Sequence, residues 1–484
     1  MDLELLIGHP LDPRDLNDDQ FGRLLDRLYE SGCDNLFHDL AISVRTTFSL
    51  PASYVLHSDT TSHVLYGEYS ACAESDVPLL QITYGYSKDK RPDLKQIMTG
   101  MLTDDDGLPI SSTTLDGNTA DCTYNEQMLS LLQSVYGSEL QKYTYIADSK
   151  LMTKENLLAL TQGEFPISFI SRLPSNFSNK LSERMKCEAY EQDQWNFLGT
   201  CCATTPGKKA PVYDAVTIPT TVYGTDMYVH VYKTTDKSEK VEKKVVRERE
   251  KLETEVKHVC KREFFCEADA IAEMNAFLAS HSALLNEVEL AVTQEVTVKK
   301  PRGRPGKEQK APLEVVRWKI GMQGIQRKEE SIAKEIEKAS TFCLITNIPS
   351  TEKSSREILL LYKGQSHVEN QFSILKQPVM AATIFLETPE RIKALMTLIY
   401  FSALMHGILR VISRIELEKE ETPPRWGKER RPLIRPTSET MLWILQMFRV
   451  VMENQEMRIE AKDPEMAKWL ERILKIVRFD PEFM

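Results

Sequence analysis

The residues best suited to chemistry in this sequence are three acids that stand far apart in the chain. Asp59 lies within a strand-like stretch, and Asp148 directly follows the apolar run YTYIA. Glu369 lies in YKGQSHVENQFSILK, whose spacing predicts a helix. A carboxylate in a central strand is costly to bury unless a cation meets it. Three carboxylates that converge would hold hard divalent cations such as Mg²⁺ or Mn²⁺.

Two such cations, about 4 Å apart, would activate a water or a 3′-hydroxyl and stabilise the leaving oxygen of a phosphodiester. Acids at the carboxyl ends of buried strands are where α/β sheets place their chemistry. The alternative to a metal-binding role for Asp148 is that of a cap or turn residue before SKLMTKEN. His57 and His63 flank Asp59 with the alternation of a strand, which puts all three on one face, so the histidines could orient the acid.

Segment 362–376 places polar side chains along one predicted helix face. At about 100° per residue they fall within roughly 60° of one another. These residues are Tyr362, Gln365, Glu369 and Lys376. A solvated polar stripe is the alternative interpretation.

The elements that must position the acids follow an α/β pattern. Alternation and turn residues predict strands at 54–69, 78–87 and 108–118. A helix at 123–137, a strand at 142–148 and a helix at 153–163 come next. This order predicts an antiparallel meander joined by a crossover to a later strand.

A strand-rich region then interrupts the α/β pattern. Its two helices are expected at 237–259, where mixed charges indicate a solvated face, and around 268–285. A short buried strand at 341–349 and a single helix from Ser354 to Lys376 resume the core pattern.

In order and context, the three acids resemble the triad of the insertion-sequence DDE transposases, which have an RNase H-like core. The long gap before Glu369 matches members with a β-strand domain inserted there. Segment 362–376 resembles their Y-(2)-R-(3)-E-(6)-K signature, with Gln365 in place of the arginine. The stretches YGYSKDKRPDLKQ, LDGNTADCT and TNIP are also similar to this family.

The resemblance implies an α/β fold in which an RNase H-like mixed sheet with flanking helices is interrupted by a β-rich inserted domain, with helical N- and C-terminal segments. The expected parts are a helical N-terminal segment that could be a truncated DNA-binding region, two parts of the catalytic core around the insertion, and a helical C-terminal region. Their bounds are 1–50, 51–170 (core), 171–340 (insertion), 341–412 (core with the signature helix) and 413–484.

The function implied by the resemblance is DNA transposition. Asp59, Asp148 and Glu369 would hold two Mg²⁺ or Mn²⁺ ions for hydrolysis at the transposon end and strand transfer into target DNA. Tyr362, Gln365 and Lys376 would contact the DNA backbone, and a homodimer would bridge two ends. The alternatives are an inactive truncated or domesticated copy that binds the ends as a regulator, and a general nuclease.

Two basic segments are candidates for further DNA contacts. KKPRGRPGK could lay Arg302 and Arg304 along a narrow A·T-rich minor groove, with a solvated loop as the alternative. PPRWGKERRPLIRP interleaves basic residues with an aromatic one, which suits backbone contacts and base stacking, with a surface linker as the alternative. The candidates in this second segment are Arg425, Trp426, Lys428, Arg430 and Arg431.

The composition is that of a globular protein of 484 residues with a net charge of −10, which argues against a surface covered in nucleic-acid contacts. The N-terminus has no signal-peptide pattern. The apolar run at 396–412 is about long enough to span a bilayer but holds His406 and Arg410, so we expect a buried helix and no membrane. A cytoplasmic protein associated with the prokaryotic nucleoid is expected.

Overall fold

The computed structural model describes two compact units. The described residues are 14, 16–69, 79–201, 210–235, 238–299, 313–377, 384–426, 431–453, 456–461, 467 and 469–478. The first unit comprises Met1–Asn179, Pro219–Val229 and Leu344–Met484. The second comprises Lys180–Ile218 and His230–Cys343.

The first unit is built on a mixed sheet with the strand order β3-β2-β1-β4-β5-β12. β1, β2 and β3 form an antiparallel meander, whereas β4 runs parallel to β1 and β5 parallel to β4. β12 pairs antiparallel with β5. The strands are β1 Val55–Leu65, β2 Lys95–Asp104, β3 Pro109–Leu115, β4 Thr144–Ala147, β5 Ser168–Arg172 and β12 Thr341–Thr346. The predicted α/β fold with a mixed sheet is confirmed.

The middle strand of the meander is not the predicted one. The expected strand at 78–87 is wrong over its described part, 79–87, where Thr83 forms an isolated bridge with Gln96. The strand is β2, which the sequence pattern did not reveal because nearly all its side chains are buried, so KQIMTGMLTD shows no alternation. Gly100 lies in its middle because a Cβ there would overlap the ring of Tyr124.

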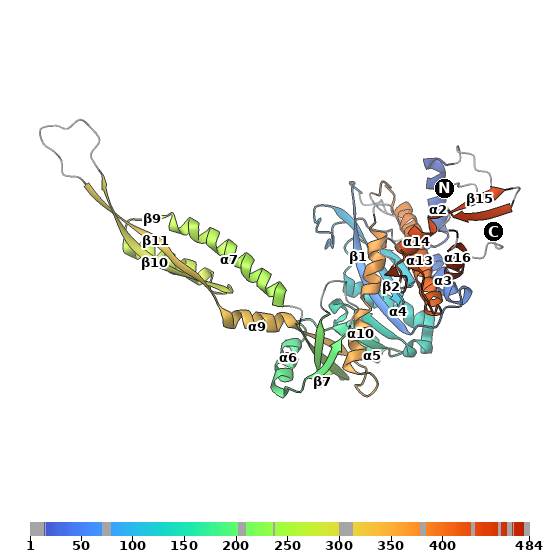
Figure 1. Ribbon diagram of the computed structural model, residues 1–484, viewed down its shortest axis with the longest axis horizontal. Helices are drawn as coiled ribbons and strands as arrows, with labels where there is room; N and C mark the ends of the chain where they lie inside the picture. Colours follow the sequence, from blue (N-terminus) through green and yellow to red (C-terminus); the bar gives the residue numbers. More distant parts are fainter. Residues whose placement is uncertain are drawn as a thin grey trace. The chain divides into compact units, whose positions relative to one another are not determined.

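Helices cover both faces of this sheet (Figure 1). α4 (Asp121–Tyr136) lies on one face, where Ser58 Oγ is 3.3 Å from Asn125 Oδ1. Three helices share a core with β2 on the other face: α3 (Cys33–Thr47), α11 (Ser366–Leu375) and α13 (Pro389–Glu418). The remaining helices of this unit are α2 Asp18–Glu30, α5 Lys154–Gln162, α10 Ser355–Lys363, α14 Ser438–Leu445 and α16 Leu470–Ile476.

The single helix expected from Ser354 to Lys376 is in fact two helices. α10 begins with a capping box between Ser354 and Glu357, as the serine at its start predicted, and ends at Lys363. α11 begins at Ser366. The break falls at Gly364, where no side chain fits, since a Cβ there would lie 2.7 Å from two ring atoms of His57. Tyr362 therefore belongs to a different helix from Glu369, and Lys376 follows the last residue of α11.

The C-terminal region is not purely helical. Besides α14 and α16 it contains the antiparallel pairs β13–β14 and β15–β16. Their bounds are β13 Arg425–Trp426, β14 Arg431–Pro432, β15 Phe448–Glu453 and β16 Glu456–Ala461. Within the described residues, α13 is long and apolar enough to cross a membrane, but 61% of its most apolar window is buried inside the fold. Its contacts with α2, α3 and β3 are those of a core helix.

The second unit contains a helix α7 alongside a long β10–β11 hairpin (Figure 1). Val241, Val245, Leu252 and Val256 of α7 are buried, and the charged side chains lie outside them, as the mixed-charge pattern predicted. The helices are α6 Leu181–Gln192, α7 Ser238–Cys260, α8 Glu267–Ser280 and α9 Glu329–Ser340. The strands are β6 Asn196–Thr200, β7 Val212–Val222, β8 Thr225–Thr234, β9 Glu263–Phe264, β10 Asn286–Lys299 and β11 Leu313–Arg327.

Candidate active site

Asp59 and Asp148 occupy neighbouring positions on parallel strands. The register pairs Ser58 of β1 with Ala147, the last residue of β4. The residue that follows each of these two is an acid, Asp59 after Ser58 and Asp148 after Ala147. β4 and β5 share the same parallel register, and the corresponding next residue of β5 is Arg172. Because the strands are parallel, Asp59, Asp148 and Arg172 follow one another across the sheet.

Asp148 is also the helix cap that the sequence offered as its alternative role. Its carboxylate accepts a hydrogen bond of 2.9 Å from the backbone nitrogen of Lys150, at the start of the 3₁₀ helix Ser149–Leu151. Capping occupies one oxygen and leaves the other available for a cation. The two interpretations of Asp148 are therefore compatible.

Glu369 is exposed on α11, between two residues that are anchored to other parts of the unit. One turn earlier, Gln365 Nε2 donates a 2.7 Å hydrogen bond to the carbonyl of Ser58. Two turns later, Lys376 Nζ lies 2.6 Å from Asp89 Oδ1. Residues at this spacing share a helix face, so Glu369 is placed between these two anchors.

Tyr362 lies close to all three acids. Burial raises the pKa of Tyr362 to about 12, and negative charge on Asp148, Glu369 and Asp59 adds to this shift. Arg172 acts in the opposite direction on the same pKa. The side chains of α10, α11 and three neighbouring strands thus meet in one electrostatic environment.

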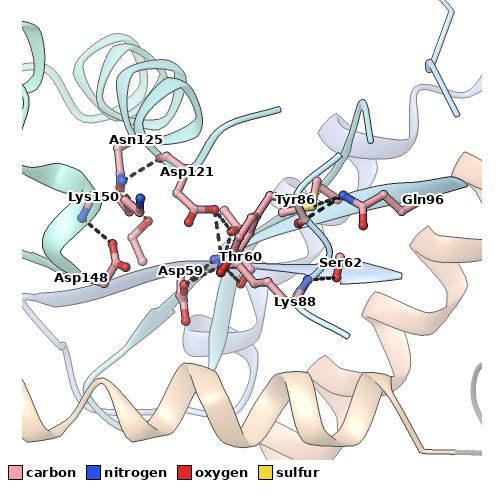
Figure 2. A network of polar contacts seen from close by, with 12 residues as sticks. Asp59, Thr60, Ser62, Tyr86, Lys88, Gln96, Asp121, Asn125, Asp148 and Lys150 are labelled. Atoms are coloured by element: carbon pink, nitrogen blue, oxygen red, sulfur yellow. Dashed lines mark hydrogen bonds and ion pairs between the residues drawn. The ribbon is translucent and has the colours of Figure 1, made fainter. Parts of the chain in front are cut away.

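Two further charged residues belong to this environment, as Figure 2 shows. Lys88 Nζ lies 3.6 Å from Asp59 Oδ1 and 3.3 Å from Asp121 Oδ1. It also donates a 2.7 Å hydrogen bond to the carbonyl of Thr60, whose hydroxyl donates to Asp121. Lys88 is therefore the counter-ion of the carboxylates on β1 and at the start of α4.

Burial and crowding raise the pKa of Asp59 and of Asp148. The pKa of Asp59 is raised to about 6 by desolvation, with smaller contributions from Asp148 and Asp121, although Lys88 opposes the shift. The pKa of Asp148 is also raised, first by burial and then by Asp121. It is costly to ionise two adjacent buried carboxyl groups, and a bound divalent cation would lower that cost.

The three predicted acids are near one another but not tightly gathered. Among the described residues, the group whose ligand atoms all lie within 4.8 Å of one another is His57, Asp105 and His367, not the acid triad. The donor set of the triad nevertheless suits a hard cation, since it consists of carboxylates on two adjacent strand positions and one facing helix.

The residues of segment 362–376 that were predicted to contact DNA, and the two histidines that flank Asp59, are each in contact with other parts of the protein. Gln365 is only 8% exposed, and its amide nitrogen is used by β1, so it holds α11 in place rather than facing solvent. Lys376 is paired with Asp89. His63 is buried near Lys376 and Asp89, and burial lowers its pKa to about 4. His57 contacts Asp105.

The basic segments are only partly described. Arg302, Arg304, Lys428 and Arg430 lie outside the described residues. Arg425 is exposed on β13, and the backbones of Trp426 and Arg431 pair with each other across β13 and β14. Their DNA contacts stay predictions.

Sequence reasoning missed the roles of Lys88 and Asp121. Both lie in stretches already noted as similar to the family, SKDKRPDLKQ and LDGNTADCT. That similarity was the available signal, but it does not say which side chain points to the acids.

The comparisons with solved structures give distant likenesses. A piggyBac transposase synaptic complex with hairpin DNA has 10% identity and a TM-score of 0.33, over 75% of this chain and 52% of that chain. A Mos1 transposase paired-end complex with left transposon end has 13% identity and a TM-score of 0.16, over 33% of this chain and 44% of that chain. This chain thus spans about half the length of the transposases it matches. No curated protein matches it.

The comparison with protein families is decisive. Residues 1–42 match a domain of unknown function, DUF4277. Residues 75–405, more than half of the chain, match the model described as the transposase DDE domain. Asp148 and Glu369 lie inside this range, and Asp59 lies before it. The chain therefore belongs to the family of transposase DDE domains.

Proposed function

We propose that this chain is a DNA transposase that cuts transposon ends and joins them to target DNA. Family membership supports the class of reaction. The observation that supports the residue assignment is the parallel register of β1 and β4, in which Asp59 and Asp148 each follow a paired residue, together with the hydrogen bond that anchors Gln365 to β1 one turn before Glu369. This arrangement supplies three carboxylates from two strands and one helix.

In this proposal Asp59, Asp148 and Glu369 hold two divalent cations, Mg²⁺ or Mn²⁺. Such a pair supplies activation of a water or 3′-hydroxyl and stabilisation of the leaving oxygen. The carboxylates orient the cations, and the raised pKa values of Asp59 and Asp148 reflect the free energy that cation binding would recover. Lys88 balances the same charge when no cation is bound.

The remaining residues of the site bind DNA in this proposal. Tyr362 and Lys376 contact the phosphate backbone near the cleaved end, and Lys376 exchanges its partner Asp89 for a phosphate. Gln365 keeps α11 on β1, a positioning role instead of the phosphate contact expected from the sequence. Two chains pair to bring two ends together, and the protein acts in the cytoplasm at the nucleoid.

The test is cleavage of plasmid DNA that carries the sequences flanking the gene. We expect wild type to cut at these flanks only with Mg²⁺ or Mn²⁺. Asp59→Ala, Asp148→Ala and Glu369→Ala should each lower the cleavage rate by roughly 1,000-fold, the order lost with a preorganised transition-state contact. DNA binding, measured by gel shift, should be retained.

The matched control is Asp93→Ala, which removes an exposed acid that is paired with Arg91. It should cut like wild type. Normal cutting by Asp59→Ala would remove the assignment. End-specific binding without cutting by wild type would indicate a regulator, and cutting without preference for the flanks would indicate a general nuclease.

A further inference from the structure

A second cluster of candidate metal ligands lies beside the acids but does not include them. His57 comes from β1, Asp105 from the turn between β2 and β3, and His367 from α11. One ligand atom from each lies within 4.8 Å of the other two. Three elements that are distant in sequence thus bring two imidazoles and a carboxylate together.

One separation in this cluster is long for a charge-assisted hydrogen bond and is compatible with two ligands of one metal ion. His57 Nε2 lies 3.4 Å from Asp105 Oδ1. A charge-assisted hydrogen bond would be about 2.7–2.9 Å long. Two ligands of a tetrahedral ion with bonds of about 2.0–2.1 Å lie about 3.3–3.4 Å apart, which matches the observed separation.

His57 faces Asp105 through Nε2, so the unpartnered Nδ1 of His57 is not the atom that would bind the ion, whereas the unpartnered Nδ1 of His367 is free for a ligand. Nδ1 of His57 and Nδ1 of His367 are buried and have no hydrogen-bond partner among the described residues. A buried polar atom of this kind ordinarily finds a partner. The carboxylate of Asp105, in contrast, is half exposed, so the cluster is open to an ion from solvent.

Two glycines make the space for the rings. A Cβ on Gly364 would press on the His57 ring, and a Cβ on Gly107 would lie 3.0 Å from the Cβ of His367. The guanidinium of Arg410 also lies beside Gly107 and donates to its carbonyl, 2.7 Å away. This positive charge opposes cation binding, so the negative charge of Asp105 is needed in the ligand set.

We propose that His57, Asp105 and His367 bind one transition-metal ion of the Zn²⁺ class. Imidazole nitrogens suit such ions, whereas Mg²⁺ takes oxygen ligands. The ion would join β1 to α11, and each histidine stands two residues before an acid, Asp59 or Glu369. The site therefore locks together the two elements that carry the first and third acids. This inference does not depend on the proposed function.

The test uses the full-length chain, stripped of metal, with Co²⁺ and Zn²⁺ as probes. To exclude binding by the acids, the background is Asp59→Asn with Glu369→Gln. We expect one Co²⁺ per chain with a visible absorption band typical of nitrogen and oxygen ligation, displaced by one equivalent of Zn²⁺. Zn²⁺ should also raise the melting temperature, because it binds the folded state.

Asp105→Asn and His367→Asn should each weaken Co²⁺ binding by at least about 100-fold, beyond the 10- to 100-fold typical of residues that only support a ligand. Asp105→Asn alters a half-exposed side chain, so its fold, checked by circular dichroism, should be intact. The matched control is His63→Asn, a buried histidine on the same strand face, which should keep the Co²⁺ band.

Three results would overturn the proposal. They are failure of the background protein to take up Co²⁺ or Zn²⁺ at one ion per chain, an unchanged affinity in Asp105→Asn, and equal losses in His63→Asn and His367→Asn. None of these outcomes bears on DNA cleavage by the acids, so the two proposals fail separately.

Discussion

At the scale of single residues, Asp59, Asp121 and Asp148 concentrate negative charge where solvent screens it poorly. Asp59 and Lys88 are each about a quarter exposed, and their charged atoms are 3.6 Å apart. Lys88 also bridges to Asp121 and to the backbone of β1. One lysine thus offsets repulsion between carboxylates from two elements, and a divalent cation would do the same from the other side.

We predict that Lys88→Met lowers the melting temperature in the absence of divalent ions, by the equivalent of about 1 kcal/mol for a partly exposed ion pair. Added Mg²⁺ should then raise the melting temperature of the variant more than that of wild type, because the acids lack their other counter-ion. Differential scanning fluorimetry with and without Mg²⁺ measures both effects.

Lys142→Met, which breaks an exposed pair with Glu139, is the control and should respond to Mg²⁺ like wild type. If Lys88→Met shows the same Mg²⁺-induced shift as wild type, Lys88 and the cations do not share a site.

The sequence singled out the acids because a carboxylate within a strand is costly to bury without a cation, and because the family signature adds Glu369; their role as metal ligands stays a prediction. The roles of Lys88 and Asp121 could not be predicted from the sequence. Their interactions with Asp59 depend on the positions of a turn and of a helix start, and only the fold sets these positions. Gln365 was assigned to DNA from its place in the signature, but its burial against Ser58 gives it a positioning role.

At the scale of elements, the junction between α10 and α11 decides where Glu369 lies. Gly364 leaves room for the His57 ring, and Gln365 then anchors the first turn of α11 to β1. A larger residue at 364 would push α11 from the strand, and Glu369 would move with it.

We predict that Gly364→Ala destabilises the protein by about 1–3 kcal/mol, the usual range for overpacking. It should also lower the cleavage rate, since the displaced helix carries an acid of the site. The control is Gly324→Ala, where nothing lies within 4 Å of the added methyl group. Thermal unfolding together with the cleavage assay checks the prediction, and wild-type values for both in Gly364→Ala would contradict it.

Some elements were readable from the sequence and others were not. The pattern found β1 and β4 from their β-branched and aromatic residues and flanking turns, and α4 and α5 from their helical spacing. It missed β2, which is buried on both faces, and it joined α10 and α11, because their junction falls at Gly364, whose close approach to the ring of His57 is a tertiary contact. Both misses come from tertiary packing that local periodicity cannot report.

At the scale of the whole molecule, the chain is divided into units with separate hydrophobic clusters. One cluster of the first unit joins β2, α3, α11 and α13, and those of the second unit lie around α7. The predicted boundaries were 170 and 340, and the compact units change at Asn179 and Cys343. Residues 219–229, the tip of the β7–β8 hairpin, belong to the first unit, where Gln162 Nε2 donates to the carbonyl of Tyr223. No pattern in the sequence indicates that the tip of this hairpin belongs to the first unit.

A buried histidine in the second unit gives a pH dependence to the stability of the molecule. His230 is fully buried, its Nδ1 lies 2.9 Å from Thr217 Oγ1, and burial lowers its pKa to about 4. An unfolded histidine has a pKa of about 6.5. Between these values the unfolded chain binds a proton that the folded chain does not, so stability falls as the pH falls from 6.5 to 4.

We predict that His230→Gln is less stable than wild type at pH 7 but loses less stability on acidification. Each pKa unit corresponds to about 1.4 kcal/mol, so the wild-type contribution that disappears by pH 4 is of the order of 3 kcal/mol. Urea unfolding at pH 7 and near pH 4.5 measures the difference in the free energy of unfolding between the two proteins at each pH. That difference should shrink at the lower pH, where the unfolded wild-type chain gains its proton.

His258→Gln, at an exposed position of α7, is the control, and the difference between its free energy of unfolding and that of wild type should stay constant. A His230→Gln difference that is the same at both pH values would show that this histidine is protonated equally in the folded and unfolded chains.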